Sequence, residues 1–102
     1  MKNMINSLFK LVKSGYQCKR TIKKHLKNDI NSASYILATY YDGLIKEIED
    51  KDTLTLDQID TIVTQLNAHR EEYPENDDVE QLLTQITSFF KTVKPFVKLN
   101  MA

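Results

Sequence analysis

The sequence predicts an all-α protein, built as a small antiparallel four-helix bundle, and three observations favour this fold. Apolar residues recur three and four positions apart along most of the chain, which is the spacing of one helix face. No segment alternates apolar and polar residues in the way that a half-buried strand requires. The two glycines are too few for several tight hairpin turns. Helices with one apolar stripe each, joined by short loops, pack as antiparallel neighbours.

Length and composition define the broad class of protein. The 102 residues support a single domain, residues 1–102. A hydrophobic fraction of 41% and a formal net charge of zero argue against a disordered chain. The single cysteine cannot form an internal disulfide, and no apolar run approaches the ~18 residues of a membrane span. Polar residues interrupt the apolar N-terminal segment and no small-residue cleavage site follows, so we expect this segment to be retained and the protein to be cytoplasmic.

The N-terminal part predicts two short helices. The first covers roughly residues 3–13, and Ser14-Gly15 supplies its stop. The second is basic and covers roughly residues 17–28, with Cys18, Ile22 and Leu26 on one face. A polar stretch at residues 28–32 then offers a break and a new N-cap.

The strongest helical pattern lies in residues 32–50. Gly43 inside this segment costs roughly 1 kcal/mol relative to alanine and predicts a close helix crossing or a kink. The sequence leaves open whether this helix and the preceding basic segment form one long bent helix. The apolar stripe consists of Ala33, Ile36, Leu37, Tyr40, Leu44, Ile45 and Ile48.

The signals that start and stop helices are clearest in the C-terminal half of the chain. Thr55-Leu56-Asp57-Gln58 has the spacing of a capping box and opens a predicted helix over residues 56–72, which Tyr73-Pro74 ends. Acidic residues at 77–80 open the last helix, which we expect to stop at Lys94-Pro95. Residues 95–102 then form a short apolar and basic tail that either folds back on the bundle or docks a partner.

Charge is separated along the chain. Residues 1–28 hold eight bases and no acid, whereas residues 29–80 hold all 14 acids and three bases. Residues 81–102 add three lysines. Either the basic and acidic zones face each other in the fold and partly neutralise, or each faces a partner.

No arrangement of residues indicates catalysis. Cys18 and His25 lie seven positions apart on one helix, about 10 Å along its axis, which is too far for a nucleophile–base pair. No Cys or His pair has metal-ligand spacing, and the acidic segment around Asp50 lacks the glycine and glutamate of a calcium-binding EF-hand loop. Glycine-rich phosphate loops are also missing. We therefore expect no enzymatic activity, no cofactor and no metal.

Nucleic acid is one candidate partner. Ser14-Gly15 followed by a basic segment resembles a helix-turn-helix, although Ile22 lies one position later than the apolar residue of that motif. This hypothesis makes the chain a small DNA- or RNA-binding regulator that uses residues 16–28, and it predicts steep salt dependence. Its candidate binding residues are Lys19, Arg20, Lys23, Lys24 and Lys27.

A protein partner is the preferred hypothesis. Small helical bundles without a catalytic set commonly act by surface complementarity, as inhibitors, immunity proteins or adaptors. Tyr40 fits the apolar stripe of its helix, whereas Tyr41 lies about 100° away and is expected to be exposed for binding. Phe96 in the predicted tail is the second candidate contact. Residues 3–13 also have the composition of a helix that lies on an anionic membrane surface, but their apolar face serves the bundle core equally well, and packing in the core is the preferred interpretation.

Overall fold

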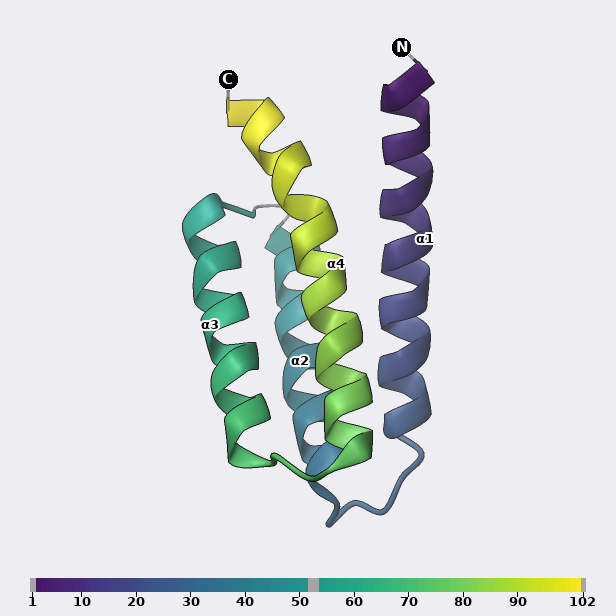
Figure 1. Cartoon of the computed structure of the whole chain (residues 1–102), viewed down its shortest axis with the longest axis vertical. Coiled ribbons are helices and arrows are strands. Elements are labelled where there is room, and N and C mark those ends of the chain that lie inside the picture. The colour runs from purple at the N-terminus through teal and green to yellow at the C-terminus, as the bar shows by residue number, and fades with distance from the viewer. Residues whose placement is uncertain (1, 52–53, 102) are drawn as a thin grey trace.

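The computed structural model describes the backbone of residues 2–51 and 54–101, and side chains within residues 12–51 and 54–97. It contains four helices, namely α1 (Lys2–His25), α2 (Ala33–Lys51), α3 (Leu56–Glu72) and α4 (Asp77–Met101). The helices alternate in direction, so the two ends of the chain lie at the same end of the bundle (Figure 1). The described part of the chain contains no strand. The predicted antiparallel four-helix bundle is confirmed.

Helix α4 is the centre of the bundle. It packs against each of the other three helices, and α1 also packs against α2. Among the described residues, no Cα atom of α2 lies within 8 Å of a Cα atom of α3, although the two helices are consecutive in the chain. Helix α4 therefore contacts all three other helices, whereas the backbones of α2 and α3 do not approach each other closely (Figure 1). The largest fully buried apolar side chains are Tyr41, Phe90, Ile22, Ile59, Leu66, Leu82, Leu83 and Ile86.

The predicted stop at Ser14-Gly15 is wrong, because α1 runs through it without a break. A Cβ atom added to Gly15 would lie 3.5 Å from Cε1 of Phe89, an ordinary van der Waals distance, so α1 packs against α4 at this point. The helical cost of glycine, roughly 1 kcal/mol, is offset by this packing and by the buried Cys18 and Ile22 that follow. The first two predicted helices are thus one helix.

The chain reverses between α1 and α2, which are separate helices. Asp29 forms a turn in which its carboxylate accepts a hydrogen bond from the backbone N–H of Asn31 at 3.0 Å. Ser32 caps α2, since its hydroxyl accepts from the backbone N–H of Tyr35 at 3.2 Å. The predicted break at residues 28–32 is confirmed, and the alternative of one bent helix is resolved in favour of two.

The capping box of α3 forms as the sequence predicts. The hydroxyl of Thr55 accepts from the backbone N–H of Gln58 at 3.1 Å, and the Gln58 side chain accepts from the backbone N–H of Thr55 at 2.8 Å. Tyr73 follows the last residue of the helix and precedes Pro74. The predicted bounds of 56 and 72 are those of the structure.

Helix α4 does not stop at Lys94 as predicted but continues through Pro95 to Met101. Proline inside a helix costs roughly 3 kcal/mol, because it lacks an N–H donor and crowds the carbonyl four residues earlier. Pro95 lies on the exposed side of α4, while Val93 and Val97 on either side of it are buried. Burial of this apolar face stabilises the helix on both sides of the proline, so residues 95–101 are its last turns and not a separate tail.

His25 is expected to make the stability depend on pH. It is 1% exposed, its Nδ1 lies 3.3 Å from Nδ2 of Asn28, and burial lowers its pKa below the ordinary 6.5 against the opposing charge of Asp78. The unfolded chain therefore takes up a proton on His25 at a higher pH than the folded chain does, so the free energy of unfolding falls as the pH drops from 8 to 5.5. Urea denaturation across this range checks the slope. His25→Gln should flatten it, and an equal slope in both proteins would contradict the assignment.

Candidate partner-binding groove

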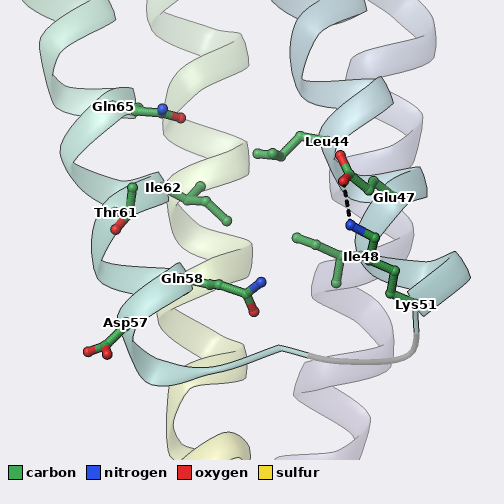
Figure 2. Close-up of a pocket in the computed structure, with 9 residues that line it drawn as sticks. All are labelled: Leu44, Glu47, Ile48, Lys51, Asp57, Gln58, Thr61, Ile62 and Gln65. Atoms are coloured by element: carbon green, nitrogen blue, oxygen red, sulfur yellow. Dashed lines mark hydrogen bonds and ion pairs between the residues drawn. The ribbon is translucent and has the colours of Figure 1, made fainter.

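A groove lies where α2 and α3 diverge, next to the connection between them (Figure 2). It has a volume of about 320 Å³, within the range of small ligand pockets. Its apolar side chains, Leu44 and Ile48 from α2 and Ile62 from α3, point towards one another across the gap (Figure 2). The remaining lining residues are polar: Glu47, Lys51, Asp57, Gln58, Thr61 and Gln65.

The α2 wall of the groove belongs to a longer row of apolar side chains. Ile36 is 55% exposed and Tyr40 is 45% exposed, and Leu44 and Ile48 follow at the same interval of four residues, half-buried. This interval makes successive side chains neighbours on the helix surface, although each is rotated by about 40° from the one before it. We call Ile36, Tyr40, Leu44 and Ile48 the α2 row. Leu44 and Ile48 line the groove and Tyr40 bonds Gln65, so these three lie on the side of α2 that faces α3.

A second set of α2 residues faces the core. Leu37, Ala38, Tyr41 and Ile45 are all buried, and all but Ala38 lie one position after a member of the α2 row. The apolar stripe predicted for residues 32–50 combines residues of both sets, which is why Tyr40 was expected in the core and Tyr41 outside it. That assignment of the two tyrosines is wrong, because Tyr41 is 0% exposed and cannot reach a partner from this position.

Two tyrosines of α2 form hydrogen bonds with α3 at the end of the groove that lies away from the α2–α3 connection. The Tyr41 hydroxyl lies 2.7 Å from Nδ1 of His69, and the Tyr40 hydroxyl donates to Oε1 of Gln65 at 3.1 Å. Burial raises the pKa of Tyr41 above its ordinary range, so its hydroxyl stays protonated in this hydrogen bond. The rings of Tyr40 and Tyr41 meet edge to face, with centroids 4.9 Å apart. These contacts fix the distance between the two helices at one end while the other end stays open.

The rim of the groove is acidic. Residues 42–60 hold seven acids and two bases. Lys51 bonds Glu47 at 2.8 Å, and this hydrogen bond lowers the pKa of Glu47 and raises that of Lys51. Lys46 is likewise 3.1 Å from Asp42, so both bases of the segment are engaged by acids of the same helix. Glu49 and Asp60 pair with Lys19 and Lys94. Asp50 and Asp57, which are in no ion pair that the structure describes, therefore give the rim its negative charge.

Gly43 does not mark a close crossing. It is exposed, and a Cβ atom added to it would meet nothing within 4 Å. The expectation of a close crossing at Gly43 is therefore wrong, while the alternative of a kink stays a prediction.

The basic face of α1 is only partly neutralised. Lys19 forms an ion pair with Glu49 at 2.7 Å, and Lys24 donates to Oε1 of Gln81 at 3.3 Å. Arg20, Lys23 and Lys27 are exposed and make no ion pair with any acid that the structure describes. Because α1 is continuous, the turn of a helix-turn-helix does not form at Ser14-Gly15. The basic residues instead lie along one uninterrupted helix.

The other predicted residues lie apart from the groove. Phe96 is half-buried near the end of α4. Cys18 is 1% exposed, and burial raises its pKa to about 12, so its thiol is a packed core group and not a nucleophile. Within the part of the chain that the structure describes, no three His, Cys, Asp or Glu residues are grouped as metal ligands would be.

Sequence reasoning missed the groove, although the sequence contained its signal. The apolar stripe of residues 32–50 is too wide for one helix face, since its members Ile36 and Ile45 lie on opposite sides of the helix. A stripe of that width indicates either two packed neighbours or one neighbour and one uncovered surface. Only the position of α3 decides between them.

No protein-family model, curated protein or solved structure matches the chain. None of the helices, over the residues described, combines the length and apolar character needed to cross a membrane.

Proposed function

We propose that the chain is a non-enzymatic protein-binding module whose α2–α3 groove accepts an amphipathic helix with basic flanks. One observation carries this proposal, namely the α2 row, in which Ile36 and Tyr40 are exposed and Leu44 and Ile48 are half-buried at intervals of about one helical turn. An apolar row beside a groove is the surface on which helix-in-groove recognition depends. The acidic rim favours a basic partner, because complementary charge speeds encounter and rejects acidic competitors.

The size of the groove limits what enters it. Its volume of about 320 Å³ is roughly twice that of a 150 Å³ cavity that holds benzene. One or two large apolar side chains therefore fit, while the body of the partner helix lies along the α2 row. The row spans three turns, about 18 Å, which corresponds to a partner helix of about 12 residues.

Fluorescence anisotropy with a synthetic peptide tests this proposal. The probe is a 16-residue helix with leucines and phenylalanines on one face and lysines on the other. We expect Ile48→Glu to weaken binding at least tenfold and Thr61→Lys to weaken it about threefold, since a cation at this rim position repels the peptide. Circular dichroism verifies that each variant is folded.

Two matched variants serve as controls. Thr39→Glu adds a carboxylate to an exposed position of α2 that does not line the groove, and Thr64→Lys does the same with a cation on α3. Both should bind the peptide as the native chain does. Absence of binding to the native chain, or equal weakening by Thr61→Lys and Thr64→Lys, would reject the groove as the binding surface.

A second candidate function is binding of DNA or RNA along α1. The observation that favours it is the exposed set of Arg20, Lys23 and Lys27, which no described acid neutralises, beside Tyr16 with 66% of its surface exposed. Phosphates would contact the cations, and an unpaired base would stack on Tyr16. Replacing these cations with alanine should then abolish a steeply salt-dependent affinity for an oligonucleotide that Ile48→Glu leaves unchanged.

A further inference from the structure

We infer that the α2–α3 groove is filled by residues 2–13 of a second copy of this chain, in a symmetric dimer. This inference rests on the proposed function, because it names the basic amphipathic helix that the groove accepts. Three observations support it: the projection of this part of α1 from the bundle, its amino-acid sequence, and its location at the same end as the groove.

The N-terminal turns of α1 project from the bundle. Figure 1 shows α1 extending past the connection between α2 and α3, while the last turns of α4 lean away from α1. Val12, on this part of α1, is 71% exposed, which is the highest value among the large hydrophobic side chains that the structure describes.

Residues 2–13 have the chemistry that the groove requires. Their sequence contains three lysines and no acid. Its apolar residues recur at helical spacing, as in an amphipathic helix with basic flanks. The segment is about 18 Å long as a helix, which equals the length of the α2 row. The apolar residues are Met4, Ile5, Leu8, Phe9, Leu11 and Val12.

The placement of the two surfaces permits a closed assembly. The groove lies beside the connection between α2 and α3, which is at the same end of the bundle as the N-terminus of α1 (Figure 1). When two copies meet at this end around a twofold axis, each can place its projecting helix in the groove of the other. Such an interface is isologous, so it closes at two subunits and does not grow into a filament.

An anionic membrane is the other surface that attracts a basic amphipathic helix. The charges beside the groove favour a second copy instead. Asp57 lines the groove and Asp50 precedes the lining residue Lys51; both are exposed, and neither is in an ion pair that the structure describes. These carboxylates repel an anionic bilayer and attract the lysines of a second copy, so the dimer is the assembly that the charges favour.

Analytical ultracentrifugation of the full chain tests the dimer. Between 1 and 100 μM we expect a concentration-dependent mass that rises from 11.9 kDa towards twice this value. Leu8→Glu in the projecting segment and Ile48→Glu in the groove should each raise the dissociation constant at least tenfold. Gln17→Glu and Thr39→Glu, which place the same charge on exposed positions elsewhere on α1 and α2, should leave it unchanged.

Mixing the two disruptive variants gives a sharper result. A homodimer of either variant has no intact contact, whereas a dimer of one Leu8→Glu chain and one Ile48→Glu chain keeps one. Fluorescence energy transfer between differently labelled variants should therefore show the mixed dimer at concentrations where each variant alone is monomeric. This rescue also excludes misfolding as the reason for dissociation.

Each remaining outcome overturns the inference in its own way. A chain that stays monomeric at 100 μM, or a dimer that survives both variants, removes the proposed interface. Sedimentation with phosphatidylserine vesicles that depends on Leu8 and not on Ile48 assigns residues 2–13 to a membrane instead. A monomeric chain whose groove still binds the synthetic peptide loses the dimer but keeps the proposed function, and a chain that does neither loses both.

Discussion

Phe90→Ala is expected to lower the free energy of unfolding by about 3–5 kcal/mol, which is the usual cost of removing a buried aromatic side chain. Phe90 is 1% exposed on α4, and its ring meets that of Phe89 edge to face with centroids 5.2 Å apart. Since α4 contacts all three other helices, the cavity loosens the packing of the whole bundle. A total stability of ~5–15 kcal/mol leaves little margin for such a loss.

Urea denaturation followed by circular dichroism measures this effect, with the midpoint and the slope compared between proteins. Ser88→Ala on the exposed face of the same helix is the control and should change the stability by no more than ~0.5 kcal/mol. Phe90→Leu should fall between the two, because it restores part of the lost volume. A loss below ~1 kcal/mol for Phe90→Ala would mean that α4 is not the centre of the core.

Local sequence signals predicted those parts of the fold that local interactions determine. The bounds of α3 were predictable because Thr55 and Gln58 satisfy each other's backbone groups within one turn, and because Pro74 restricts the residue before it. The break before α2 was predictable for the same reason, since Ser32 caps the helix through its own hydroxyl. No distant part of the chain is needed for either feature.

Contacts between distant segments decided the features that were predicted wrongly. Gly15 and Pro95 both disfavour a helix by themselves, but α1 continues because it packs on Phe89 and α4 continues because Val93 and Val97 are buried. Tyr40 and Tyr41 were interchanged because the sequence of α2 does not show from which side α3 approaches. The groove itself arises from the distance between α2 and α3, which no single helix encodes.

Tyr41→Ala is the second substitution with a large expected effect, about 3–5 kcal/mol in the free energy of unfolding, since a fully buried ring is lost. Tyr41→Phe separates the ring from the hydroxyl. It removes only the 2.7 Å hydrogen bond to His69, which is half-buried, and should cost about 1–2 kcal/mol. Tyr40→Phe removes an exposed hydrogen bond to Gln65 and is the matched control, with an expected loss of no more than ~0.5–1 kcal/mol.

The same variants also test whether the hydrogen bonds of the two tyrosines set the distance between α2 and α3, and with it the width of the groove. If the Tyr41–His69 bond fixes the distance between α2 and α3, Tyr41→Phe lets the helices separate and weakens binding of the synthetic peptide several-fold while the protein remains folded. Tyr40→Phe should change the affinity less, because its partner Gln65 is itself within the groove and free to adjust. Equal peptide affinities for native, Tyr41→Phe and Tyr40→Phe proteins would show that α4 alone sets the spacing, since it packs against both helices. The hydroxyl would then contribute only to stability.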